Sequence, residues 1–268
     1  MENQTKITFE RRGHVALISL GIPGGVNPLD ADLITELADA VEEVSQDSGI
    51  RCLVITGQNS SFGAGADLKN VIAMDVEGNI AYGKQLRQTF DSIAELPIPT
   101  IAAINGHALG GGLEVALACS IRISAEDLVL GLPEVKLGLI AAAGGIQRLI
   151  RTINRGPAFD LLVTGRMLRP DEAHRLGLVD RVVPKDELLD EALKMADRIA
   201  GNSPAAVRAV VELMRRGIDQ PLDEAQAETD KASAGVLGSG EYLEGVSAFL
   251  EKRKPAFGED TGAKGQAS

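Results

Sequence analysis

Two glutamates stand out because each lies in an apolar stretch beside a glycine-rich turn. Glu114 follows Gly110 to Gly112 at the start of an expected helix that is otherwise apolar, and Glu134 lies within the mainly apolar segment 128–139. A carboxyl group in such surroundings is either on the surface or buried with a raised pKa, which suits proton transfer near neutral pH. Two such glutamates, each attached to a glycine-rich turn, favour acid–base chemistry by the pair.

Three glycine-rich segments, 61–68, 106–114 and 132–145, each follow an expected strand. A glycine-rich turn at the start of a helix leaves backbone N–H groups unpaired, and these bind an anion or a developing negative charge. None matches a nucleotide-binding fingerprint, because Leu68 stands where a third glycine is needed and no Gly-Lys-Ser/Thr run is present. Alternatively, the glycines only permit tight turns and close helix packing, which explains two loops at strand-to-helix transitions less well.

Composition and charge exclude several classes of protein. The 268 residues include 27 basic and 38 acidic ones, and the net charge of −11 disfavours a binder of nucleic acid or of anionic membranes. Three histidines and two cysteines disfavour zinc chemistry, a thiol nucleophile and a histidine-based triad, and no Gly-x-Ser-x-Gly elbow is present. No apolar run reaches 18 residues and the polar N-terminus lacks a signal-like region, so we expect a cytoplasmic protein.

Short apolar runs alternate with longer helical patterns over the first two-thirds of the chain, which predicts an α/β fold with parallel strands. Residues 7–11 and 15–20 flank a hairpin turn, and Asp30 is suited to cap a helix that ends near Ser45. Further strands are expected at 52–56, 100–104 and 121–124, and further helices at 72–95 and 113–118.

The last third of the chain changes character. After residues 178–183 the pattern is almost entirely helical, with helices expected at 188–200, 204–216, 222–236 and 242–254. We therefore divide the chain into an α/β core at 1–200, a helical oligomerisation region at 201–258, and a small, polar tail at 259–268 that we expect to be disordered.

Several ordered motifs resemble those of the crotonase superfamily, in particular its enoyl-CoA hydratase/isomerase family. Residues 62–69 resemble the family's Phe-x-Ala-Gly-Ala-Asp-Leu/Ile-Lys, and residues 106–114 resemble Gly-x-Ala-Leu-Gly-Gly-Gly-x-Glu. Residues 132–138 resemble Leu-Pro-Glu-x-x-Leu-Gly, and residues 144–149 resemble Gly-Gly-x-x-Arg-Leu. The resemblance covers nearly the whole chain, and it implies a spiral of β-β-α turns followed by a helical region that assembles a homotrimer or a dimer of trimers.

The resemblance also implies a reaction. The backbone N–H groups of Ala66 and Gly111 would form an oxyanion hole for the thioester oxygen of an acyl-CoA as it becomes enolate-like. Glu114 and Glu134 would be the catalytic carboxylates that add water across the C2–C3 double bond of a 2-enoyl-CoA. Relatives that isomerise, hydrolyse or decarboxylate often lack the first carboxylate, so the presence of both glutamates favours hydration. No metal or redox cofactor is implied, because coenzyme A is part of the substrate.

The same resemblance implies positions for binding coenzyme A and the acyl chain. They are Val26, Ala64, Asp67, Leu68, Lys69, Ala142 and Lys252. For residues 252–254 an equally good alternative is a solvated cationic end that stabilises its own helix. Residues 141–143 are all alanine where many hydratases have Pro-Gly, and Ser120 stands where the family commonly has Asp.

Two other functions remain open from the sequence. One is another enolate-type reaction on an acyl-CoA, such as double-bond isomerisation, and the other is a non-enzymatic RNA-binding role, against which the net charge argues. The sequence does not identify the acyl group.

Overall fold

The computed structural model describes residues 5–21, 27–58 and 61–258 of the 268-residue chain. Its main sheet has six strands in the order β1-β2-β3-β5-β7-β9. The hairpin β1–β2 is antiparallel, and all other pairs are parallel. The strands are β1 (Ile7–Arg12), β2 (Val15–Leu20), β3 (Cys52–Gly57), β5 (Thr100–Ile104), β7 (Ile121–Ala125) and β9 (Arg181–Val183). The predicted α/β fold with parallel pairing is confirmed.

A second, three-stranded parallel sheet lies beside the first. It consists of β4 (Ser61–Gly63), β6 (His107–Leu109) and β8 (Leu130–Gly131). Each of these short strands follows a strand of the main sheet along the chain, and helices lead back to the main sheet. The resulting β-β-α turns are the spiral that the resemblance implied. The sequence did not indicate this small sheet, because runs of two or three residues with glycine carry no strand periodicity.

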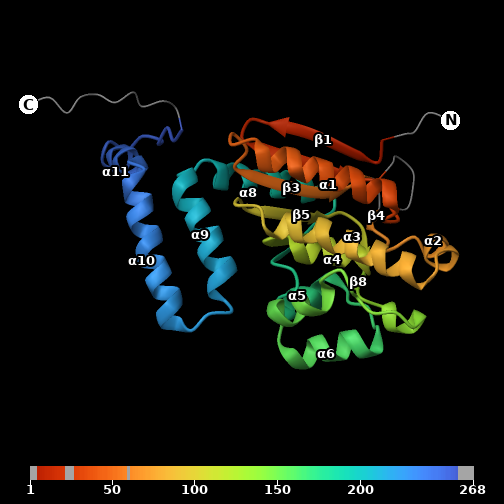
Figure 1. Ribbon diagram of the computed structural model, residues 1–268. Helices are drawn as coiled ribbons and strands as arrows, with labels where there is room; N and C mark the ends of the chain where they lie inside the picture. Colours follow the sequence, from red (N-terminus) through yellow and green to blue (C-terminus); the bar gives the residue numbers. More distant parts are fainter. Residues whose placement is uncertain (1–4, 22–26, 59–60, 259–268) are drawn as a thin grey trace, which may run out of the picture.

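The helices of the α/β body surround and fill the space between these sheets (Figure 1). They are α1 (Ala31–Gln46), α2 (Leu68–Ala73), α3 (Val76–Ala94), α4 (Gly111–Ala118), the 3₁₀ turn η1 (Glu134–Leu137), α5 (Gly145–Thr152), α6 (Arg155–Thr164), α7 (Pro170–Leu176) and α8 (Leu188–Ala200). Asp30 caps α1 as predicted, since its carboxylate accepts the N–H of Leu33 at 3.0 Å.

The predicted helix over 72–95 is confirmed for residues 76–94, but its start is wrong, because two helices rather than one cover residues 68–94. The first, α2, ends at Ala73, and the carboxylate of Asp75 accepts the N–H of Gly78 at 2.7 Å to begin α3. The Asn79 side chain donates to the carbonyl of Val71 at 2.9 Å and stabilises the bend. A strong N-cap in the middle of a helical pattern therefore overrides its periodicity.

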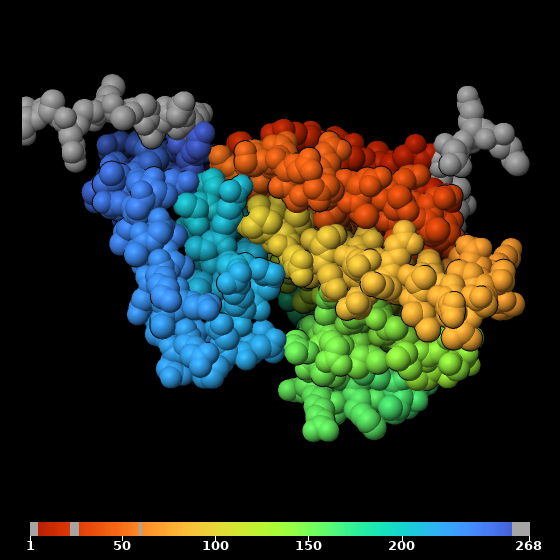
Figure 2. Space-filling view, viewed as in Figure 1, coloured from red at the N-terminus to blue at the C-terminus, as the bar shows by residue number. Residues whose placement is uncertain are grey.

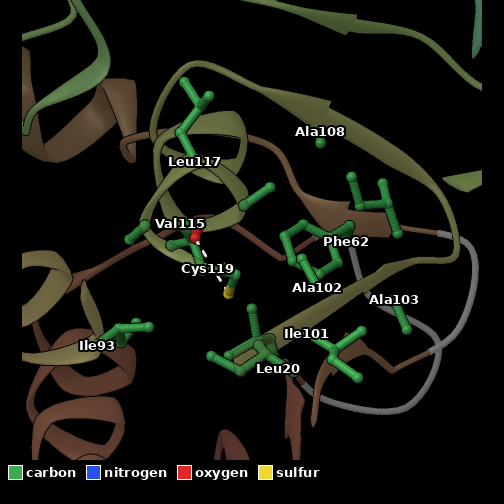
Figure 3. Close-up of a cluster of buried hydrophobic side chains, with 14 of the residues drawn as sticks. Leu20, Phe62, Ile93, Ile101, Ala102, Ala103, Ala108, Val115, Leu117 and Cys119 are labelled. Carbon is green, nitrogen blue, oxygen red and sulfur yellow. Dashed lines mark hydrogen bonds between the residues drawn. The ribbon is translucent and has the colours of Figure 1, made fainter. Parts of the chain in front are cut away.

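Helix α4 is buried along its whole length and lies at the centre of the core. Figure 3 shows Phe62, Ala102 and Val115 in one cluster of buried side chains around it. The backbone of β4 crosses α4 so closely that a Cβ atom on Gly112 would overlap the carbonyl of Gly63. A side chain at either glycine would separate the small sheet from this helix.

The C-terminal helices stand beside the α/β body (Figures 1 and 2). They are α9 (Pro204–Gly217), α10 (Leu222–Gly238) and α11 (Glu241–Leu250), so the predicted helical region is confirmed. The last helix ends four residues before the predicted end at Lys254, because Lys252 has a positive φ of 55° and Arg253 folds back onto Glu244 at 2.6 Å. The predicted tail at 259–268 lies outside the described residues. None of the described helices is both long enough and apolar enough to cross a membrane.

One buried cation connects α4 to the edge of the main sheet, and this generates a prediction about stability. Arg122 donates to the carbonyls of Cys119 and Leu178, each at 2.7 Å, and lies 3.6 Å from the Asp180 carboxylate. We expect Arg122→Met to lower the free energy of unfolding by about 2–4 kcal/mol, because two buried carbonyls lose their donors. Urea unfolding followed by circular dichroism measures this change.

The matched control is Arg215→Met. Arg215 makes an exposed ion pair with Glu212 at 2.6 Å on α9, and such pairs contribute about 0–1 kcal/mol. Equal losses in the two variants would contradict the role of Arg122.

Candidate active site

A pocket of about 340 Å³ opens between the loop before α2, one face of α3, the start of α4, and residues 133–143. It brings together seven of the residues that the sequence singled out. They are Ala64, Ala66, Leu68, Gly111, Glu114, Glu134 and Ala142. Segments from three successive turns of the spiral therefore meet at one place.

Two backbone N–H groups lie side by side in this pocket. Leu29 forms a β-bridge with Ala66 and donates its N–H to the Gly65 carbonyl at 2.9 Å, which holds the first loop extended. Gly111 is the first residue of α4, where N–H groups have no acceptor within the helix. A Cβ on Gly111 would lie 3.9 Å from the Ala66 nitrogen, so the two amides are close neighbours. This arrangement suits an oxygen that gains negative charge.

Glu114 is buried, with 3% of its surface exposed, and one of its carboxylate oxygens accepts the N–H of Gly145 at 2.8 Å. Its pKa is raised to about 7, mainly by burial and also by the charge of Glu134. The amides of Gly145 and Ala143 and the charge of Arg148 act in the opposite direction. This carboxyl group therefore exchanges a proton in the neutral range.

Glu134 begins η1 and reaches the pocket from the opposite side. One of its oxygens lies 3.0 Å from the position that a Cβ on Gly110 would occupy, so the carboxylate closely approaches the start of α4. Its other oxygen, Oε2, is buried and has no hydrogen-bond partner among the described residues. Burial raises the pKa of Glu134 as well. An unpartnered carboxyl oxygen with a raised pKa is suited to move a proton to or from a bound molecule.

The rest of the pocket wall is mostly apolar. Helix α3 supplies one part of it. Asn79, Tyr82, Gly83 and Leu86 line the pocket at helical spacing. The Tyr82 hydroxyl donates to the carbonyl of Leu29, the residue paired with Ala66. Burial raises the pKa of Tyr82 to about 12. Tyr82 and Leu86 lie on the helix expected over 72–95, and helical periodicity does not distinguish a core face from a pocket wall.

The structure does not bring every predicted binding residue to the pocket. Asp67 caps α2 by accepting the N–H of Lys69 at 3.0 Å, and neither residue lines the pocket. Lys252 follows α11, at the opposite end of the molecule from α2 (Figure 1). Val26 lies outside the described residues.

Arg253, the residue after Lys252, forms ion pairs within the chain. Arg253 pairs with Glu244 and Glu251, each at 2.6 Å, and these partners raise its pKa. Within the described residues, no group of three or more His, Cys, Asp or Glu side chains is placed to hold a metal ion.

Comparison with known proteins agrees with this fold and gives the family of the chain. The family model described as enoyl-CoA hydratase/isomerase matches residues 10–260. A probable mitochondrial enoyl-CoA hydratase of Dictyostelium discoideum is 39% identical, over 93% of this chain and 90% of the relative. A crotonyl-CoA hydratase of Syntrophomonas wolfei is 38% identical, over 94% of this chain and 97% of the relative. The crystal structure of an enoyl-CoA hydratase from Bacillus anthracis superimposes with a TM-score of 0.92 at 40% identity, covering 94% and 98% of the two chains. The chain belongs to the enoyl-CoA hydratase/isomerase family, within the crotonase superfamily.

The raised pKa of Glu114 predicts how stability depends on pH. The unfolded chain releases this proton above about pH 4.5, whereas the folded protein keeps it until about pH 7. Stability from this group is therefore fully present below pH 4.5 and is lost as the pH rises through 7. We expect the free energy of unfolding of the wild type to fall by about 3 kcal/mol relative to Glu114→Gln between pH 4.5 and 8.

Urea unfolding at a series of pH values measures this difference. The control is Glu77→Gln on the exposed surface of α3, which should follow the wild-type pH dependence. If the free energies of unfolding of the wild type and Glu114→Gln differ by the same amount at every pH from 4.5 to 8, the raised pKa of Glu114 is contradicted.

Proposed function

We propose that the protein is an enoyl-CoA hydratase, a hydro-lyase that reversibly adds water in the syn sense to the C2–C3 double bond of a 2-enoyl-CoA. The observation that carries this proposal is the meeting of a buried glutamate, a half-buried glutamate and two neighbouring amides in one largely apolar pocket. The names of the relatives, which include crotonyl-CoA and short-chain-enoyl-CoA hydratases, support an acyl-CoA thioester as the substrate.

In the proposed mechanism the amides of Ala66 and Gly111 hold the thioester oxygen, where charge develops as the enolate forms. Glu114 accepts a proton from water while the water oxygen forms its bond to C3. Glu134 donates a proton to C2, and the electrons of the double bond form the new C–H bond. The sum is one water added, with one proton gained by Glu114 and one lost by Glu134. The environments of the two carboxyl groups support this division, since only Glu134 has a buried, unpartnered oxygen.

We place the acyl chain against the apolar wall of the pocket. This wall consists of Leu68, Val71, Leu86, Leu137, Leu139 and Ile140. We place the pantetheine arm along the first loop, with Ala64, Asp67 and Lys69 as its neighbours and Ala142 beside the water. No cofactor enters this mechanism. The two cysteines are free and buried, which supports the expected cytoplasmic location.

Glutamine variants test the assigned roles. We expect Glu114→Gln and Glu134→Gln each to lower kcat for hydration of crotonyl-CoA about 10²–10⁴-fold with little change in KM, because an amide keeps the shape but transfers no proton. Loss of absorbance of the conjugated thioester measures the rate. Glu77→Gln serves as the control.

The same variants separate hydration from double-bond isomerisation. The wild type should hydrate crotonyl-CoA faster than it isomerises a 3-enoyl-CoA. If Glu114→Gln loses hydration but retains a wild-type isomerase rate as the main activity, the hydratase assignment fails.

We further propose that the protein assembles as a homotrimer or a dimer of trimers through its C-terminal helices. Large apolar side chains are exposed on this unit of the single chain. They include Val210, Met214, Leu222, Leu243, Phe249 and Leu250. Large apolar side chains exposed along three neighbouring helices support an interface between subunits.

Light scattering coupled to gel filtration tests the assembly. The wild type should have three or six times the 28.2 kDa mass of one chain, and Phe249→Asp should lower it, because a charge enters the apolar surface. The matched control is Glu77→Lys on α3. A monomeric wild type, or an unchanged mass in Phe249→Asp, would contradict this proposal.

A further inference from the structure

Arg148 on α5 contacts the turn that precedes its own helix. Its Nη1 donates to the carbonyl of Ala143 at 3.1 Å, and its side chain is 18% exposed. The guanidinium lies over Gly144, where φ is 104° and a Cβ atom would overlap Nη1. The Gly-Gly-x-x-Arg pattern of residues 144–148 therefore has a local reason, since only glycine permits both the turn and the arginine contact.

The turn held in this way is the one that contacts Glu114. The N–H of Gly145 donates to Glu114, and a Cβ on Gly145 would lie 2.8 Å from the same carboxylate oxygen. Ala142 and Ala143 line the pocket. Arg148 thus fixes, from one side, a short segment that fixes Glu114 from the other.

Arg148 also connects this turn to α3. Its Nη2 lies 2.5 Å from the carboxylate of Asp91, whose side chain is 40% exposed. Earlier on the same helix, Leu86 and Tyr82 line the pocket. The guanidinium is thereby held between two walls of the site.

The charges around Glu114 come from few sources. Glu134 approaches from η1, Arg148 from α5, and Asp91 from α3 behind Arg148. Helix α4 carries no other charged side chain, and neither do β4 and β5. His107 of β6 is exposed, and its ring accepts the N–H of Val129.

We propose that Arg148 is a positioning residue for Glu114: it fixes the 143–145 turn that hydrogen-bonds the carboxylate, and its positive charge favours the ionised form of Glu114. This inference rests on the proposed hydratase function, in which Glu114 must be ionised to activate water. Asp91 holds the guanidinium in place and moderates its charge.

The pH profile of kcat/KM distinguishes this role from a merely structural one. Without the cation, Glu114 ionises at higher pH. The acidic limb of the kcat/KM profile of Arg148→Met should therefore move to higher pH by about half a pH unit or more. Its activity loss should be about threefold or more at pH 6 and should shrink towards pH 9. Arg148→Lys keeps the charge and should retain a limb close to that of the wild type.

Arg151→Met is the matched control on the same helix. Arg151 is exposed and pairs with Asp219 at 3.4 Å, so its removal should leave the profile unchanged. A loss in Arg148→Met that is equal at all pH values, or an equal shift in Arg151→Met, would overturn the inference.

A titration without substrate separates this inference from the proposed function. Carbon-13 NMR of glutamate-labelled protein, with the Glu114 signal assigned by comparison with Glu114→Gln, reports directly the pH at the midpoint of the Glu114 titration. The midpoint should rise in Arg148→Met and remain near the wild type in Arg148→Lys. If no hydratase activity is found, the proposed function fails while this titration still decides the role of Arg148.

Asp91→Asn provides a second variant should Arg148→Met fail to fold. It removes the negative partner and leaves the cation, so the Glu114 midpoint should stay the same or fall. An upward shift in Asp91→Asn would contradict the electrostatic role of Arg148.

Discussion

The burial of α4 is the constraint on which the rest of this structure depends. An eight-residue helix with apolar side chains on all sides must be enclosed by other elements, and β4, β5, β6, α3 and α5 enclose it. Close approach requires a helix surface without side chains where β4 crosses, which Gly63 and Gly112 provide. The same packing leaves only the N-terminal end of the helix open to the pocket. The amide of Gly111 and the carboxyl of Glu114 are therefore presented there by the core itself.

Placing two carboxyl groups in this pocket opposes folding, because burial disfavours their charged forms. The surroundings offset part of this cost. Unpaired N–H groups at the start of α4 favour negative charge, the Gly145 amide hydrogen-bonds Glu114, and Arg148 adds a nearby cation. None of these groups pairs with the buried oxygen of Glu134. The site thus stabilises one carboxylate and leaves the other poised, a difference that acid–base chemistry requires.

Much of the main sheet could be predicted from sequence, because β3 and β5 are continuous apolar runs buried on both faces. The pairing of Glu114 with Glu134 was predicted from their shared setting of glycine-rich turns. The small sheet and the break between α2 and α3 were missed, since both depend on tertiary contacts or on a single capping residue. Tyr82 was not recognised as a site residue, because a pocket wall and a core face have the same helical period.

The binding of the nucleotide end of coenzyme A links the site to the proposed assembly. The protein has a net charge of −11, and cations such as Arg122, Arg148 and Arg253 form ion pairs within the chain. Lys69 follows the pocket residue Leu68 on α2, whereas Lys252 follows α11 at the opposite end of the molecule. In the proposed assembly, Lys252 would therefore meet a bound anionic nucleotide at the site of another subunit. The apolar surface of α9 to α11 would then both hold the subunits together and bring positive charge to a neighbouring pocket, which would couple assembly to substrate affinity.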